Sequence, residues 1–194
     1  MIAKGEPWGT EADPPDGLAC AESDAAAAQL IERSRGPVIR LGSGDLVRTL
    51  GGPRSASSGT TWFPMDCGWL SIDGGVEMAF VAHVVARRRW WRGEGAVVMN
   101  AAWLGELYLG PRAHPNDGLL DVTYGSLPIR QRPQARQRAR HGTHLPHPGL
   151  QSRRVAAWDH TFSSSIDVFV DGVRRGRGRS IAVRVEPDSF TVVH

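Results

Sequence analysis

Lysine, cysteine and long apolar runs are scarce in this 194-residue sequence. Lys4 is the only lysine among 23 basic residues, a bias that follows from GC-rich codons and carries little information about function. Cys20 and Cys67 are the only cysteines, which excludes a disulfide-stapled scaffold and predicts reduced thiols. No apolar run approaches the roughly 18 residues that span a bilayer, and the first residues lack the apolar core of a signal peptide. We therefore expect a cytoplasmic protein.

What the sequence does contain is ordinary for a globular protein, with 41% hydrophobic residues and a net charge of +3. Residues 24–33 (DAAAAQLIER) predict a helix that Ser23 or Asp24 can cap. A short strand is expected at 37–41 and a second helix at 46–50. Further along, strands rich in β-branched and aromatic residues are predicted at 69–72, 76–86, 96–103, 119–124, 167–173, 180–186 and 190–193, with one polar helix at 130–140.

A tight polar turn precedes an apolar run in the segment PRAHPNDGLLDV, residues 111–122. Pro115 fixes one φ angle and Gly118 permits a positive φ, while the two residues between them favour Asx turns. Such a turn can direct the Asp117 carboxylate and several backbone carbonyls to one point, which suits a hard cation. A hairpin turn without a ligand is the other interpretation, and the local chemistry leaves both open.

A second turn has the sequence Gly42-Ser43-Gly44. It connects the strand expected at 37–41 to the helix expected at 46–50. Backbone N–H groups at the start of a helix can bind phosphate. Two glycines in a turn are also common without any ligand, so this unit by itself indicates little.

Three segments resemble, in the same order, motifs of the diacylglycerol kinase family, which includes bacterial lipid kinases and sphingosine kinases. Residues 41–51 resemble its PxGTGNDxARxLG motif, and residues 111–121 resemble its RPxDGxLD motif. Near the C-terminus, residues 168–172 and 181–187 resemble its vDGE strand and the partner of that strand. The resemblance covers about residues 20–194 and is fairly specific, because the three motifs keep their order.

The resemblance implies a β-rich α+β fold, with a lipid-kinase-type antiparallel β-sandwich at 53–194 and a reduced α/β fragment at 1–52 that is the remnant of a nucleotide-binding domain. It also implies ATP-dependent phosphoryl transfer to a lipid hydroxyl. The implied site residues are Asp171 as general base, Gly42, Ser43, Gly44 and Asp45 at the nucleotide phosphates, and Asp117 with the backbone carbonyls of His114 and Leu119 as ligands of a structural Mg²⁺.

Three departures from the family pattern concern the nucleotide and the catalytic strand. The GGDGT loop that precedes the glycine turn in the family is missing, and residues 19–24 (ACAESD) hold the nearest position. Asp45 stands where the family has Asn-Asp, and Val173 replaces the acidic residue after the Asp-Gly pair. The alternative function is therefore a non-catalytic lipid- or ligand-binding module that has lost the nucleotide site. In a third case, a partner chain supplies the nucleotide-binding half.

Arginines cluster at 87–92, 130–140 and 174–179, and the first cluster contains Trp90 and Trp91. Arginine beside tryptophan suits an anionic membrane surface, here the inner face, and it also suits single-stranded nucleic acid. Exposed arginines beside buried tryptophans are the structural alternative. Membrane contact is expected before nucleic acid, because the lipid-kinase resemblance implies a substrate in the membrane. A homodimer is left open.

His141, His144 and His147 form a short histidine-rich stretch that invites comparison with zinc sites. Gly142 and Pro146 argue against the helix that would bring the first two rings together. The stretch also resembles the short GxH segment of the family. We therefore do not expect zinc here.

Overall fold

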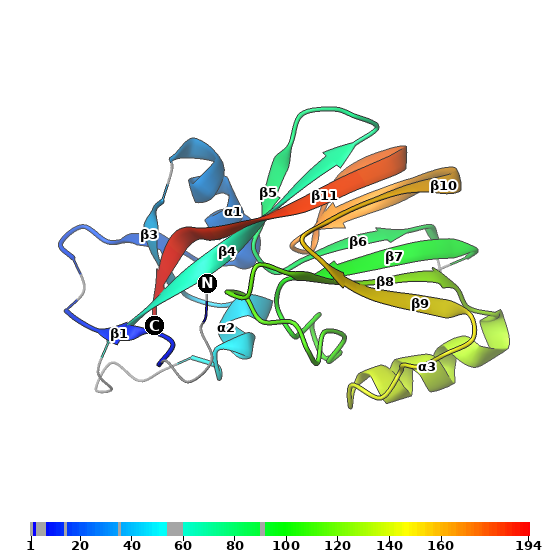
Figure 1. The fold of residues 1–194 in the computed structure, drawn as a ribbon, viewed down its shortest axis with the longest axis horizontal. Helices are drawn as coiled ribbons and strands as arrows, with labels where there is room; N and C mark the ends of the chain where they lie inside the picture. The colour runs from blue at the N-terminus through cyan, green and yellow to red at the C-terminus, as the bar shows by residue number, and fades with distance from the viewer. Residues whose placement is uncertain (1, 3–6, 14, 35, 54–59, 90–91) are drawn as a thin grey trace.

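A long, bent β-sheet organises the residues that the computed structural model describes, namely 2, 7–13, 15–34, 36–53, 60–89 and 92–194 (Figure 1). Its main path runs β1-β4-β11-β10-β6-β7-β8-β9, while β2, β3 and β5 join at its sides. The strands are β1 (Thr10–Glu11), β2 (Ala19–Ala21), β3 (Val38–Leu41), β4 (Thr61–Ile72), β5 (Met78–Phe80), β6 (His83–Arg87), β7 (Glu94–Met99), β8 (Leu120–Ser126), β9 (Leu150–Val155), β10 (Ala157–Val170) and β11 (Val173–Val193). The helices are α1 (Asp24–Arg33), α2 (Asp45–Thr49) and α3 (Arg132–Ala139), the last preceded by a 3₁₀ turn at Ile129–Gln131. The β-rich α+β class expected from the sequence is confirmed.

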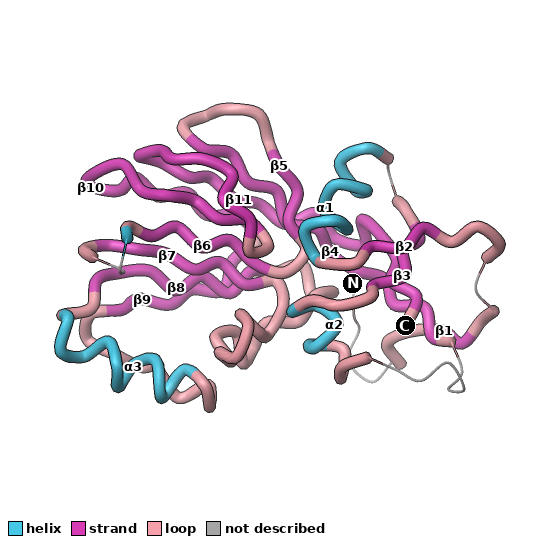
Figure 2. Tube along the Cα trace, turned by 180° about the vertical axis from the view of Figure 1, so that it is seen from behind, coloured by secondary structure: helices cyan, strands magenta, loops and turns pink. Residues whose placement is uncertain are grey.

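The sheet folds back on itself and encloses one of the two main hydrophobic cores. β10 pairs with β11 near both of its ends, but it pairs with β6 only through residues 167–170, so the two parts of the sheet diverge beyond that contact (Figures 1 and 2). Side chains from both parts meet in between, among them Val84, Phe162 and Ile166. Because side chains alternate along a strand, His83 and the other odd-numbered residues of β6 lie on the opposite, outer face.

A second core joins the N-terminal helices to the last residues of β11. α1 is capped by Ser23, whose hydroxyl accepts the N–H of Ala26 at 3.2 Å, so the predicted helix and its cap are confirmed. β3 pairs in parallel with residues 191–193 of β11, and Phe190 and Val192 pack among the buried residues of α1, α2 and β3. The last residues of the chain therefore complete the core of the first fifty. The division into units at residue 52 stays a prediction.

The C-terminal strand differs from the sequence expectation. Two strands are predicted at 180–186 and 190–193, but both belong to β11, which pairs with β4 on either side of an irregularity. Asp188 lies in that irregularity with a φ of 51°, and its N–H donates to Asp66 on β4 at 3.0 Å. The turn signal at Asp188 therefore produces only a local distortion of β11, because the neighbouring strand β4 continues past it.

α3 lies beside β9 at the outer edge of the sheet (Figure 2). Its residues are polar and Ala139 alone is buried, in agreement with the polar helix predicted at 130–140. None of the helices in the described part of the chain is long and apolar enough to cross a membrane.

Candidate functional site

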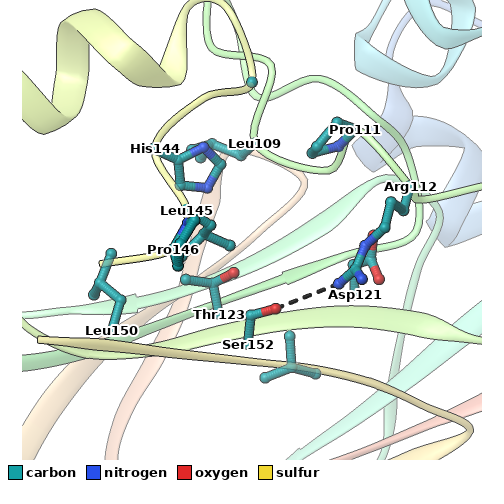
Figure 3. A pocket seen from close by; sticks show the side chains of 12 residues that line it. Leu109, Pro111, Arg112, Asp121, Thr123, His144, Leu145, Pro146, Leu150 and Ser152 are labelled. Atoms are coloured by element: carbon teal, nitrogen blue, oxygen red, sulfur yellow. Dashed lines mark hydrogen bonds between the residues drawn. The ribbon is translucent and has the colours of Figure 1, made fainter. Parts of the chain in front are cut away.

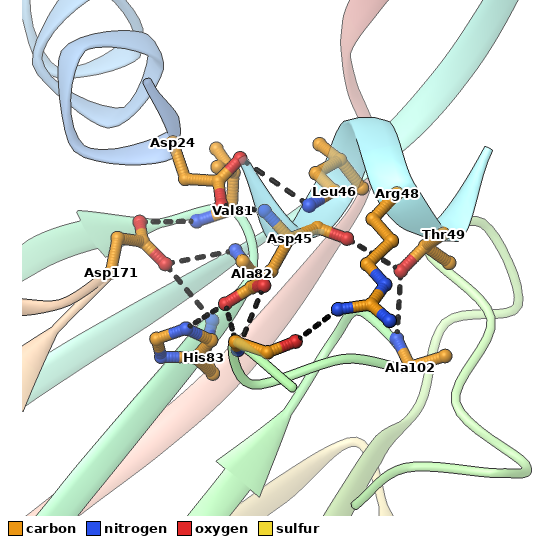
Figure 4. Close-up of polar contacts among 11 residues, drawn as sticks. Asp24, Asp45, Leu46, Arg48, Thr49, Val81, Ala82, His83, Ala102 and Asp171 are labelled. Carbon is orange, nitrogen blue, oxygen red and sulfur yellow. Dashed lines mark hydrogen bonds and ion pairs between the residues drawn. The ribbon is translucent and has the colours of Figure 1, made fainter. Parts of the chain in front are cut away.

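Four titratable side chains meet where the N-terminal helices contact the sheet (Figure 4). Asp24 is the first residue of α1, Asp45 is the first residue of α2, and His83 begins β6. Asp171 lies in the turn between β10 and β11. Two of the four, Asp45 and Asp171, are among the site residues predicted from the sequence.

Asp171 occupies a two-residue hairpin turn and directs its carboxylate into the protein. Its φ of 46° and that of Gly172 at 80° are both positive, as the favoured two-residue hairpin turn requires. The carboxylate accepts the backbone N–H groups of Val81, Ala82 and His83 at 2.9, 3.0 and 2.9 Å. Burial raises the pKa of Asp171, against the opposing effect of His83 and the three N–H groups. Asp171 and Gly172 thus form a hairpin turn, and the Asp171 carboxylate also links that turn to the start of β6.

Asp45 faces the sheet and pairs with a buried histidine. Its carboxylate lies 2.9 Å from His83 Nε2 and accepts the N–H of Gly105 at 2.9 Å. Burial would raise the pKa of Asp45, but the hydrogen bonds from His83 and Gly105 outweigh it and lower the pKa. The pKa of His83 is raised, because its partners Asp45 and Asp171 outweigh a burial effect of opposite sign. We infer an ion pair between a protonated imidazole and a carboxylate that holds α2 against the sheet.

The glycine turn before α2 is closed by a carboxylate from the same chain. Asp24 accepts the N–H groups of Asp45 and Leu46 at 2.6 and 3.4 Å, which are the groups at the start of α2. Gly44 has a φ of 135°, and a Cβ atom there would lie 2.3 Å from Asp24 Oδ1, so only glycine fits beside this carboxylate. Ser43 donates its hydroxyl to the carbonyl of Glu22 at 2.7 Å.

Asp24 was not predicted as a site residue. The signal available in the sequence is its place in ACAESD, the segment that stands where the family has its GGDGT loop. Burial, reinforced by the nearby negative charge of Asp171, raises the pKa of Asp24 from 3.8 to about 7. The glycine turn predicted to bind phosphate therefore lies against acidic side chains of the protein itself, Glu22 at Gly42 and Asp24 at Gly44.

A cavity of about 230 Å³ opens beside this cluster, on the outer face of β6. His83 and Gly172 form its polar end, next to the Asp171 turn. Val85 and Phe169 contribute apolar walls, and Arg87 lies over the ring of Phe169 at 4.7 Å. A small ligand in this cavity would contact His83 and the backbone of the Asp171 turn.

The PNDGL turn is fixed to β4 by a second carboxylate that sequence reasoning missed. Asp66 is fully buried and accepts the N–H of Gly118 at 2.6 Å and the side-chain amide of Asn116 at 3.4 Å. Its own N–H donates to the carbonyl of Pro115 at 2.7 Å. A single acidic residue inside the apolar run WFPMDCGWL was the available signal.

The three residues predicted to bind Mg²⁺ lie together in this turn. Asp117 accepts the N–H of Leu119 at 2.9 Å with one oxygen, and its other oxygen forms an ion pair with Arg154. His114 packs its ring against Trp8, with the ring centroids 4.4 Å apart. Carboxylate and carbonyl oxygens are ligand types that suit Mg²⁺. The Arg154 guanidinium already neutralises the Asp117 carboxylate, however, so Mg²⁺ would have to displace Arg154. In the described part of the chain no group of three His, Cys, Asp or Glu side chains is arranged to hold a metal. The magnesium site stays a prediction of the resemblance.

Removing Arg154 tests the magnesium prediction directly. If Asp117 binds Mg²⁺, we expect 10 mM MgCl₂ to raise the melting temperature of Arg154→Ala more than that of the wild type, because the carboxylate no longer has a competing cation. Ten times the dissociation constant would add about 1.4 kcal/mol to the stability. Asp117→Asn should abolish the response in thermal unfolding with CaCl₂ and NaCl as controls. Equal responses of all three proteins would contradict a cation at Asp117.

The other candidate clusters of the sequence are dispersed. His144 is buried, His141 is exposed, and His147 accepts the N–H of Gly149 at 3.0 Å, so the three rings serve different contacts. Trp90 and Trp91 lie outside the described residues.

The comparisons with known proteins concern the fold. No family model and no curated protein matches the sequence. Three solved structures from Bacillus anthracis strain Sterne do match; one is described as a diacylglycerol kinase and two carry that assignment provisionally. One of the two provisionally assigned structures is 13% identical to this chain, with a TM-score of 0.66, and the match covers 89% of this chain and 75% of that one. The other two have TM-scores of 0.57 and 0.58 at 13% and 12% identity, and the matches cover 81% and 82% of this chain and 67% and 69% of theirs.

The fold resemblance inferred from three short motifs is thus confirmed by structures that share few residues with this chain. That inference rested on the glycine turn at 41–51, the PNDGL turn before β8 and the Asp-Gly turn before β11. This chain has the fold of these diacylglycerol kinase structures, and the Asp24 carboxylate lies against its glycine turn.

Proposed function

We propose that this protein is a non-catalytic, ligand-binding member of the diacylglycerol kinase fold, in which an internal carboxylate replaces the nucleotide phosphates. The observation that supports this is the hydrogen bonding of Asp24 to the N–H groups of Asp45 and Leu46. A phosphate at the same place would meet the Asp24 carboxylate at contact distance. Above pH 7, where Asp24 is ionised, two negative charges at about 4 Å repel each other by several kcal/mol near a protein surface.

The state of Asp171 supports the same proposal. A general base needs a lone pair directed at the hydroxyl from which it takes the proton. Both oxygens of Asp171 already accept backbone N–H groups from residues 81–83. Its carboxylate is thus engaged in holding the hairpin turn to β6, a structural role that requires no substrate.

Phosphoryl transfer to a lipid hydroxyl is the second candidate. The 230 Å³ cavity favours it, because His83 and the Asp171 turn form its polar end and the rest of its lining is largely apolar. An acceptor hydroxyl there would lie beside the residue predicted as general base. The phosphate donor would then have to bind without the glycine turn, or on a partner chain.

Anionic membrane contact belongs to either candidate. Arg174, Arg175 and Arg177 lie in the first part of β11, and Arg87 ends the strand on the other side of β10. Asp167 neutralises part of this charge through Arg174 at 2.7 Å. The remaining arginines provide a basic edge that suits acidic headgroups.

One vesicle experiment separates the two candidates. The protein is incubated with vesicles of phosphatidylcholine, phosphatidylglycerol and diacylglycerol, with radiolabelled ATP and Mg²⁺, and both sedimentation and lipid-bound phosphate are measured. We expect the protein to sediment with the vesicles in a salt-sensitive manner and to leave no lipid phosphate above the Asp171→Asn background. In a separate calorimetric titration, we expect no heat of ATP binding at millimolar ATP. Phosphate incorporation that depends on Asp171 would overturn the non-catalytic proposal and establish the kinase.

A further inference from the structure

A second and larger cavity, of about 460 Å³, lies on the outer face of β8 and β9 (Figure 3). Thr123 and Ser152 of these strands line one side, and the opposite side comes from the loop before β8 and the segment after α3. It shares no lining residue with the cavity beside His83. Its volume falls within the range of about 300–1,000 Å³ that is typical of small-molecule sites.

His144 presents an unpaired imidazole to this cavity. The residue is only 5% exposed, and neither ring nitrogen has a hydrogen-bond partner among the described residues. Figure 3 shows the ring directed toward the space above Thr123. Burial lowers the pKa of His144, so the ring is neutral and offers one N–H donor and one acceptor nitrogen. Buried polar groups in folded proteins are almost always paired, which indicates that a ligand or water completes this one.

Asp121 offers a complementary acceptor at the other end of the cavity. It is 8% exposed, and its Oδ1 has no hydrogen-bond partner within the described chain. The nearest cation, Arg154 Nε, is 3.9 Å away, beyond hydrogen-bond distance. Arg112 stands beside it and donates to the Ser152 hydroxyl at 3.4 Å.

The charges around the cavity balance. Arg112 and Arg154 are matched by Asp117 and Asp121, so neither an anion nor a cation has a net electrostatic advantage. Donors and acceptors alternate with the apolar surfaces of leucine and proline residues. This combination suits an uncharged molecule whose polar groups both donate and accept.

We propose that the cavity binds a polyol of about monosaccharide size, whose hydroxyl groups reach His144 and Asp121 while its C–H surface rests on Leu150 and Pro146. A hydroxyl group both donates and accepts, so it matches a neutral imidazole at one end and a carboxylate at the other. The polyol can be a free sugar or the headgroup of a glycolipid. This inference rests on the proposed function only in treating the chain as a ligand-binding protein.

Imidazole signals of His144 provide the direct test. In side-chain ¹H–¹⁵N NMR spectra, D-glucose, myo-inositol and octyl glucoside below its micellar concentration are titrated against the wild type. We expect at least one of them to shift the His144 ring nitrogens in a saturable manner. Cyclohexanol, with a ring of similar size and one hydroxyl, should bind about tenfold more weakly, since it leaves one end of the site unpaired. Equal binding of D-glucose and octyl glucoside would assign a free sugar, and tighter binding of the glucoside would assign a lipid headgroup.

His144→Phe keeps a ring of similar shape and removes both nitrogens, so it should weaken polyol binding by about tenfold in calorimetry while the protein stays folded. His141→Phe, three residues away and exposed, is the matched control and should bind as the wild type does. Leu150→Trp should fill the cavity and abolish binding. The inference is overturned if no polyol shifts the His144 signals, if cyclohexanol binds equally well, or if His144→Phe binds normally. None of these outcomes depends on lipid phosphorylation, so the experiments on the polyol site and the vesicle experiment on the proposed function can succeed or fail independently of each other.

Discussion

Asp171→Ala is expected to lower the free energy of unfolding by about 4 kcal/mol, because three backbone N–H groups lose their acceptor. The N–H groups of Val81, Ala82 and His83 converge on this one carboxylate. The variant also places alanine at a φ of 46°, which costs about 1–2 kcal/mol of backbone strain. Aspartate tolerates this left-handed conformation better than alanine does. For a chain of this length the melting temperature should fall by about 10 °C, as measured by calorimetry or circular dichroism.

Asp171→Asn and Asp167→Asn are the matched variants. Asparagine keeps the turn conformation and one acceptor oxygen, so the first should lose about half as much stability as alanine does. Asp167, four residues earlier on β10, forms an ion pair with Arg174 at the surface, and its loss should change stability by less than about 1 kcal/mol. A purely catalytic Asp171 would behave differently, since its alanine variant would keep the wild-type melting temperature.

Asp24→Asn is expected to gain stability over the wild type as the pH rises, so that the variant compares more favourably with the wild type at pH 8 than at pH 5. The pKa of Asp24 is raised from 3.8 to about 7 by burial and by Asp171, so the folded protein holds this proton more tightly than the unfolded chain does. The resulting stability is present at low pH and is lost as the pH rises through about 7. Between pH 5 and pH 8 the ionisation of this carboxyl should lower the free energy of unfolding of the wild type by on the order of 3 kcal/mol. The asparagine variant avoids this loss.

The measurement is urea unfolding of the wild type and Asp24→Asn at pH 5 and pH 8. Asp45, His83 and Asp171 face Asp24 and also affect the profile, so the quantity to compare is the difference between the two proteins at each pH. Asp16→Asn removes an exposed carboxyl from the same segment and controls for the general loss of one charge. A difference that stays constant between the two pH values would show that Asp24 is ionised throughout, and would remove the burial argument.

The elements with local signals follow from the sequence. α1 needs a capping serine, a run of alanines and a basic last turn, all contained within eleven residues, and its predicted bounds are those observed. The Asp171-Gly172 hairpin is equally local, because two consecutive positive φ angles demand such a pair. Local rules fail where a neighbouring strand decides, as in β11, which continues through the turn signal at Asp188 because β4 runs beside it.

By itself, the sequence determined the β-rich α+β class, the helix and turn positions, and the resemblance to lipid kinases. Tertiary structure alone decided what the acidic residues do. Asp24 meets the N–H of Leu46 across 22 positions, and Asp66 meets the N–H of Gly118 across 52. No periodicity or propensity encodes such pairs, since each depends on how separate elements pack. The glycine turn is a phosphate site in the motif and the start of an internally capped helix here, and this difference depends on the packing that brings Asp24 to the first N–H groups of α2.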